Sequence, residues 1–86
     1  FMFVLINVFS SDCAAPYIAS IQKFNTITIA QKAMETLSKR AYRKYYETWS
    51  QNDGMNEDTE PHYESDSHSA HIIGYDYHDF WEIKEI

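Results

Sequence analysis

Cysteine, glycine and proline are scarce: the 86 residues contain one Cys, two Gly and two Pro. A single cysteine excludes an internal disulfide framework and a zinc site built from clustered cysteines. Two glycines exclude the glycine-rich loop that cradles phosphate groups. No apolar run approaches the roughly 18 residues that a membrane-spanning helix needs. The length allows one small domain, so we expect residues 1–86 to form a single domain without a large catalytic cleft.

Aromatic side chains, by contrast, are abundant: the chain has seven Tyr, five Phe and two Trp. These rings bury a large area per residue, and disordered chains are poor in them. Together with the scarcity of glycine and proline, this composition predicts regular structure over most of the chain.

The charge is unevenly distributed along the chain. Residues 1–50 hold three acidic and six basic side chains, a formal charge of +3, whereas residues 51–86 hold ten acidic side chains and Lys84, a formal charge of −9. The total of −6 favours solubility and disfavours general affinity for nucleic acid. The second half is therefore the part whose surface character is most distinctive.

The first 24 residues predict two strands. Eight of residues 1–9 are apolar, with branched and aromatic types dominating, which is typical of a strand buried on both faces. The alternative, the apolar region of a secretory signal, lacks a preceding basic residue. Residues 10–16 form a loop, and residues 17–24 form the second strand.

Residues 28–49 have the spacing of an amphipathic helix, and Asn25, Thr26 and Thr28 are candidate caps at its start. One face carries the apolar side chains Ala30, Ala33, Met34, Leu37, Ala41 and Tyr45. The opposite face carries Lys32, Lys39 and Arg43. We expect the apolar face to lie on a sheet and the basic face to lie in solvent.

The last third of the chain predicts a polar acidic loop over about residues 50–69 and then two strands. The strands are expected at 70–77 and 80–86, with a tight turn at His78-Asp79; one long bent strand over 71–86 is the alternative. In the last strand, alternation places Trp81 and Ile83 on one face and Glu82 and Lys84 on the other.

These elements predict an α+β fold: a small, mainly antiparallel sheet of about four strands with one long amphipathic helix on one face, in the order β-β-α-loop-β-β. The apolar N-terminal strand is expected at the centre of the sheet. The other face of the sheet stays uncovered, so we expect a homodimer if Phe80 or Trp81 points toward that face.

Catalytic chemistry is poorly supported. The lone Cys13 lacks the local motifs of nucleophilic catalysis, and we expect no cofactor and no enzymatic activity. The four histidines, His62, His68, His71 and His78, all lie in the acidic half. A surface role is the commoner interpretation, and metal binding by His68-x-x-His71 with His78 is the alternative.

The acidic half interleaves carboxylates with aromatic rings, a composition typical of protein interfaces. We therefore predict that it binds a basic protein partner, such as the groove of a nucleic-acid-binding protein. The competing interpretation is that the rings face the core and the acids provide solubility. The predicted partner-binding residues are Glu57, Asp58, Glu60, Tyr63, Glu64, Asp66, Tyr75, Asp76, Tyr77, Asp79, Trp81 and Glu82.

An alternative function uses the basic face of the helix. Basic and aromatic side chains alternate there, as phosphate and base contacts require. The overall negative charge argues against nucleic-acid binding. The residues of this alternative face are Lys32, Lys39, Arg40, Arg43 and Lys44.

In size and composition the chain resembles the small acidic accessory proteins of bacteriophages. Some of these imitate the charge of DNA and occlude a host protein. This resemblance covers the whole chain loosely, and it implies a cytoplasmic inhibitor that acts by steric and electrostatic blocking of a host protein.

Overall fold

The computed structural model describes residues 2–86, so residue 1 of the predicted first strand lies outside the described part. In chain order the elements are β1 (Phe3–Ser11), β2 (Ala14–Phe24), α1 (Ile27–Asp53), a short 3-10 helix η1 (Glu57–Thr59), β3 (His62–Ser65), β4 (Ser69–Ile73) and β5 (Tyr77–Glu85). This order confirms the predicted α+β class.

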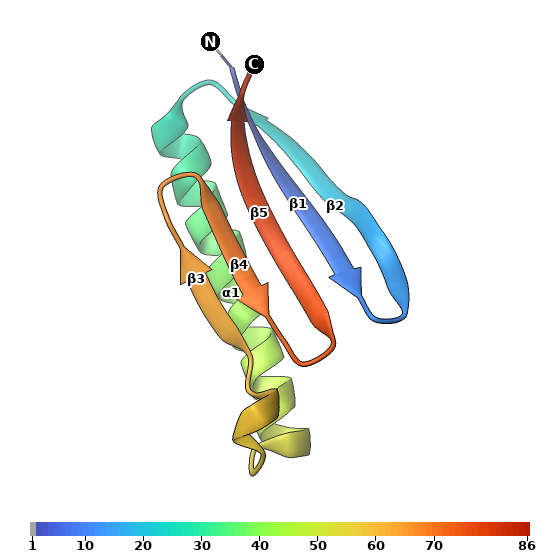
Figure 1. Ribbon diagram of the computed structural model, residues 1–86. Helices are drawn as coiled ribbons and strands as arrows, with labels where there is room; N and C mark the ends of the chain where they lie inside the picture. Colours follow the sequence, from blue (N-terminus) through green and yellow to red (C-terminus); the bar gives the residue numbers. More distant parts are fainter. Residues whose placement is uncertain (1) are drawn as a thin grey trace.

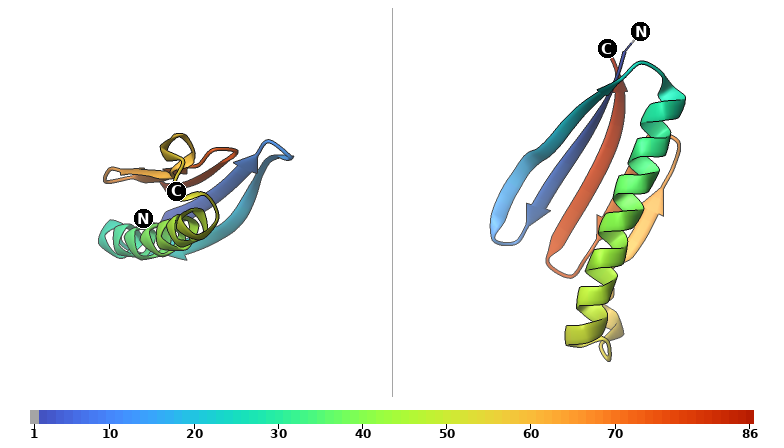
Figure 2. Two further views of the ribbon diagram at one scale, coloured as in Figure 1. Left: turned by 90° about the horizontal axis from the view of Figure 1, so that it is seen from below. Right: turned by 180° about the vertical axis from the view of Figure 1, so that it is seen from behind.

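Within the described residues the strands form one antiparallel sheet of five strands, in the order β2-β1-β5-β4-β3. Helix α1 lies along one face of this sheet, and the opposite face carries no further layer of the described chain (Figures 1 and 2). The prediction of about four strands is therefore one short. Strand β1 is internal, as expected, but the middle position belongs to β5.

The additional strand, β3, lies in the stretch predicted to be a loop. It pairs with β4, and Tyr63 is opposite Ile72. The Tyr63 hydroxyl and the Ser38 hydroxyl of α1 form a hydrogen bond of 2.8 Å. Strand β3 has only four residues, and one aromatic ring of the four faces the helix. So short a strand shows no clear alternation of apolar and polar residues, which explains why the sequence did not predict it.

The turn between the last two strands also differs from the prediction. It is formed by residues 74–76, and His78 and Asp79 lie inside β5, so the expected turn at His78-Asp79 and the single bent strand are both wrong. Gly74 donates its N–H to the carbonyl of Tyr77 over 3.0 Å. A Cβ at Gly74 would lie 2.2 Å from the Tyr77 ring, so the close approach of this ring requires glycine.

Helix α1 begins and packs as its sequence predicts. The Thr26 hydroxyl caps it by accepting a hydrogen bond from the N–H of Ile29 (3.2 Å). The predicted apolar stripe faces the sheet, with Ala30 and Met34 buried. The helix continues to Asp53, one turn further than predicted, so its last turn extends beyond the ends of the nearby strands (Figure 1).

The core lies between α1 and the sheet. Its buried side chains come from β1, α1, β4 and β5, and they are Leu5, Ala30, Met34, Ala70, Ile72, Trp81 and Ile83. Leu5 lies opposite Ile83, and Ala70 lies opposite Trp81. On β1 only Val4 and Leu5 are buried. Burial on both faces was predicted for the whole run, and it fails beyond these two residues; Ile6 and Val8, for example, project to the face that no layer covers and are half-buried.

A buried carboxylate joins the sheet to the helix. Asp79 is 5% exposed. One of its oxygens accepts a hydrogen bond from the Asn7 amide (2.7 Å), and the other accepts one from the Tyr45 hydroxyl (2.8 Å). The Asn7 amide also donates to the carbonyl of Phe80. This network links β1, β5 and α1, and every polar group in it has a partner, as burial requires.

Tyrosine ionisation is expected to destabilise the fold in alkali. Burial, together with the hydrogen bond to Asp79, raises the pKa of Tyr45 well above its ordinary value, and burial raises the pKa of Tyr77 as well. The folded state therefore holds these protons more tightly than the unfolded state. This contribution to stability is complete below about pH 10 and is lost as the pH rises further.

Urea denaturation at a series of pH values would measure this effect. We expect the free energy of unfolding to fall above about pH 10, and to fall less steeply in Tyr45→Phe, which lacks the ionisable phenol. An identical slope in the two proteins would contradict this account of Tyr45.

Candidate functional site

The twelve predicted partner-binding residues do not form one surface. Trp81 and Asp79 are 4% and 5% exposed and face the helix. Tyr63 and Tyr77 also pack against the core. For Trp81, Tyr63 and Tyr77 the position is that of the competing interpretation, in which the rings face the core; Asp79 is a buried acid, which neither interpretation predicted. Tyr75, in contrast, is 75% exposed.

The acidic members of the set are also dispersed. Glu64 and Glu82 lie on the face of the sheet opposite α1, where Glu82 forms an ion pair with Lys84 (2.8 Å). The Asp66 carboxylate accepts hydrogen bonds from the backbone N–H groups of His68 and Ser69 in the turn between β3 and β4. These hydrogen bonds lower the pKa of the Asp66 carboxyl. Its role in this structure is to hold the turn. Glu60 lies half-buried beside Tyr42 and Tyr63.

Five other carboxylates gather at one end of the molecule, which we call the acidic end. It comprises the end of α1 and η1, at the bottom of Figure 1, and the turns β4–β5 and β1–β2, which lie above them and to the right in that view. The Asp12 N–H donates to the carbonyl of Asp76 (2.9 Å), so these two turns are in contact. All five side chains belong to exposed residues. They are Asp12, Asp53, Glu57, Asp58 and Asp76.

The prediction did not include Asp12 or Asp53. Asp12 lies in the basic half of the chain, and its neighbour Asp76 is 64 positions away in the sequence. Only the pairing of β1 with β5 brings the two turns together. No local pattern in the sequence indicates this proximity.

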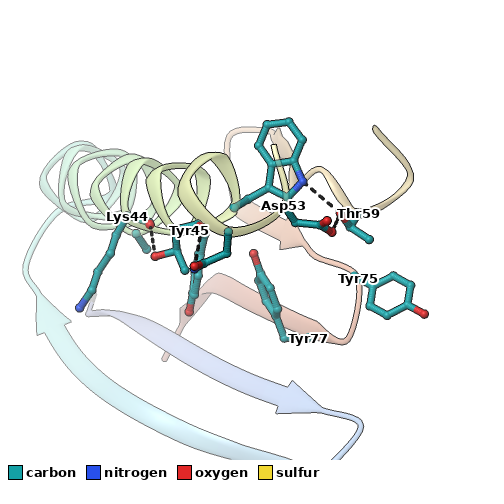
Figure 3. A pocket seen from close by; sticks show the side chains of 10 residues that line it. Lys44, Tyr45, Asp53, Thr59, Tyr75 and Tyr77 are labelled. Carbon is teal, nitrogen blue, oxygen red and sulfur yellow. Dashed lines mark hydrogen bonds between the residues drawn. The ribbon is translucent and has the colours of Figure 1, made fainter. Parts of the chain in front are cut away.

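An aromatic groove borders the acidic end (Figure 3). Its volume is about 610 Å³, and it lies between the last turns of α1, η1 and residues 75–77. Four rings line it, those of Tyr45, Trp49, Tyr75 and Tyr77, and we call this feature the aromatic groove. The Tyr45 and Tyr77 rings are 4.6 Å apart between centroids.

Polar side chains fix the floor and rim of the aromatic groove. The indole N–H of Trp49 donates to the Thr59 hydroxyl (3.0 Å), and that hydroxyl donates to the Asp53 carboxylate, so η1 is held against α1. Lys44 lies on the opposite rim. The groove thus offers apolar rings with a carboxylate and an ammonium group at its edges, the composition of a ligand-binding pocket.

The basic side chains of α1 lie on its outer surface, as predicted. A shallow groove of about 420 Å³ is lined by Lys32, Lys39, Arg40 and Arg43. Lys39 forms an ion pair with Glu35 (2.8 Å), which raises the pKa of the ammonium and lowers that of the carboxyl. Lys44 lies apart from this groove, on the rim of the aromatic groove. Nucleic-acid binding by this face stays a prediction.

The face of the sheet opposite α1, which we call the uncovered face, carries apolar side chains. Strand register places Val8 opposite both Ile18 and Phe80, and Ile6 opposite Ile21. Ile18 and Ile21 are 58% and 56% exposed. Phe80 points to this face, whereas Trp81 points to the helix. The condition stated for a homodimer, that Phe80 or Trp81 points toward this face, is therefore met by Phe80, and dimerisation itself stays a prediction.

The histidines do not form the chelate that was the alternative to a surface role. His71 lies in β4, and His68 lies in the preceding turn, where its ring bonds to Ser67, so the helical spacing that His68-x-x-His71 needs is absent. Among residues 2–86, no group of three or more His, Cys, Asp or Glu is arranged to hold a metal ion. His71 and His78, however, are in direct contact.

No protein-family model, curated protein or solved structure matches the chain. In the described part, α1 has no stretch apolar enough for a helix that crosses a membrane. The case for function therefore depends on the surfaces described above.

Proposed function

We propose that the protein is a non-enzymatic, cytoplasmic interaction protein whose acidic end binds a basic segment of a partner protein. The observation that supports this most is the position of the aromatic groove beside the acidic end. Four separate parts of the chain supply the five carboxylates, and three of these parts, the end of α1, η1 and the β4–β5 turn, also line the groove. The carboxylates by themselves favour a cationic partner, and the rings beside them add a surface to which cationic side chains can bind at short range.

The two features have complementary effects on such a partner. The carboxylates attract a cationic segment from a distance and raise the rate of encounter. At short range, aromatic faces bind Lys and Arg side chains by cation–π attraction, worth about 0.5–2 kcal/mol for each contact. The rings therefore select for cationic side chains that the carboxylates have already drawn close.

The shape of the molecule fits a blocking mechanism. Its longest dimension is 46 Å, against 24 and 16 Å for the other two. The end of α1 and η1 form one tip of this elongated body and carry three of the five carboxylates, so this tip fits a basic groove while the remainder projects outward (Figure 1). A partner groove that normally holds nucleic acid would then be occluded by negative charge in the position of phosphate groups.

Binding of a fluorescently labelled arginine-rich peptide, followed by anisotropy, tests the proposal. We expect saturable binding at about 50 mM salt that weakens steeply as salt is added, because exposed charges are screened. Reversing two carboxylates together, Asp53→Lys with Asp76→Lys, is expected to weaken binding about tenfold, since each reversal turns attraction into repulsion. Tyr75→Ala is expected to weaken it less.

The matched control is Glu85→Lys with Glu64→Lys, which changes the net charge equally but lies away from the acidic end. Equal weakening in both double variants would show that net charge alone attracts the peptide, and would refute the acidic end as the site. A labelled DNA duplex is the second probe. Binding of DNA without binding of the peptide, abolished by Lys39→Glu with Arg43→Glu, would instead support the nucleic-acid function.

A further inference from the structure

We propose that His71 and His78 together bind one divalent transition-metal ion on the uncovered face of the sheet. The two side chains project from neighbouring strands, β4 and β5. The Nδ1 atom of His71 lies 3.1 Å from the Nε2 atom of His78, and the two rings are stacked with centroids 5.2 Å apart. This site is separate from the acidic end and from the function proposed for it.

The separation of the two nitrogens suits a shared metal ion. Zinc lies about 2.0–2.1 Å from each histidine nitrogen that binds it. Two nitrogens 3.1 Å apart would then subtend an angle of about 95–100° at the metal, which lies between square-planar and tetrahedral geometry. The torsion that turns an imidazole ring about its Cβ–Cγ bond is soft, so small rotations direct both lone pairs to one point.

The surrounding residues hold the two rings in place. Phe80 lies directly opposite His71 in the strand register, and its ring packs edge-on against the His71 ring, with centroids 4.4 Å apart. Both histidines are half-buried. A pair held in this way loses little conformational entropy when it binds a metal, so the site is preorganised.

The electrostatic setting also favours a cation. Glu64 lies opposite His71 on β3, on the same face of the sheet. Imidazole nitrogens suit zinc, copper and nickel. With two protein ligands, the ion keeps positions for water, or for a side chain of another molecule that packs on the uncovered face.

A simple hydrogen bond between the two imidazoles would produce the same distance without any affinity for metal. The two interpretations differ in what happens when a metal is supplied. Zinc is the probe of choice because it has no redox chemistry and its binding to histidine requires only neutral rings.

Isothermal titration of the EDTA-treated, dialysed protein with zinc chloride tests the proposal. We expect saturable binding of one zinc ion for each chain, and at least tenfold weaker binding in His71→Gln and in His78→Gln. Zinc is also expected to raise the melting temperature of the wild-type protein and to leave that of both variants unchanged, because a ligand of the folded state stabilises it.

His68→Gln is the matched control, since His68 is exposed and lies in the neighbouring turn. It is expected to bind zinc as the wild-type protein does. Absence of saturable binding in the wild-type protein, unchanged binding in His71→Gln, or equal loss in His68→Gln would each overturn the proposal. Circular dichroism of each variant shows whether it folds, and the variants of the acidic end are expected to keep zinc binding, so the two proposals fail independently.

Discussion

Replacing Trp81 with alanine is expected to lower the free energy of unfolding by about 3–5 kcal/mol, the cost of truncating a large buried aromatic side chain. Trp81 is 4% exposed and belongs to the core that joins the sheet to α1. Small domains are stable by only about 5–15 kcal/mol. Urea denaturation followed by far-ultraviolet circular dichroism measures the change without depending on tryptophan fluorescence.

The neighbouring residue provides the control for this experiment. Phe80 lies on the uncovered face and is half-buried, so Phe80→Ala is expected to cost about 1 kcal/mol. Adjacent residues of a strand point to opposite faces, and the two costs therefore report which face of β5 is covered. Equal costs would contradict the assignment of these faces.

Removal of the buried carboxylate is expected to have the second largest effect. Asp79→Ala leaves the Asn7 amide without its 2.7 Å partner and the Tyr45 hydroxyl without its acceptor. Leaving buried donors unsatisfied costs about 1–3 kcal/mol for each group. We therefore expect a loss of about 2–4 kcal/mol, measured by the same denaturation experiment. Among the described residues, no buried side-chain nitrogen or oxygen lacks a partner in the wild-type protein.

Asp76→Ala is the matched control, because Asp76 is exposed in the adjacent turn. Its effect on the free energy of unfolding is expected to stay within about 0.5 kcal/mol, as is usual for substitutions at exposed sites. The sequence places both aspartates in the predicted partner-binding set, and the experiment separates them. A negligible cost for Asp79→Ala would show that this carboxylate does not hold α1 to the sheet.

Local patterns in the sequence predicted the elements whose burial is regular. The helical spacing around Ala30 and Met34 identified the face that packs on the sheet, because that face is continuous over many turns. Alternation in the last strand correctly separated Trp81 and Ile83 from Glu82 and Lys84. In both elements the repeat of apolar residues marks the face that packs into the core between α1 and the sheet.

Prediction failed where the packing of one side chain, which no repeated pattern in the sequence indicates, decides the local structure. The turn at residues 74–76 depends on the Tyr77 ring, which approaches Gly74 too closely for any side chain. Strand β3 depends on its pairing with β4 and on the contact of Tyr63 with Ser38. The local sequence of either segment does not indicate these contacts.

The same limit applied to the surface. The excess of acid in residues 51–86 predicted one acidic and aromatic binding surface, but the fold places Trp81 and Asp79 in the interior. It also adds Asp12, from the basic half of the chain, to the acidic end. The charge along the sequence therefore identified the half of the chain that holds most of the acidic side chains, and the strand pairing determines which of them lie near Asp12.

The most direct test of the proposed function is a residue-by-residue map of where a basic peptide binds. Amide chemical shifts of the isotope-labelled protein would be followed while the unlabelled arginine-rich peptide is added. The account predicts that the shifts change around Asp53, residues 57–59 and residues 75–77, and that β2 and the first turns of α1 stay unchanged. Changes centred on the uncovered face, or spread evenly over all exposed acidic residues, would contradict it.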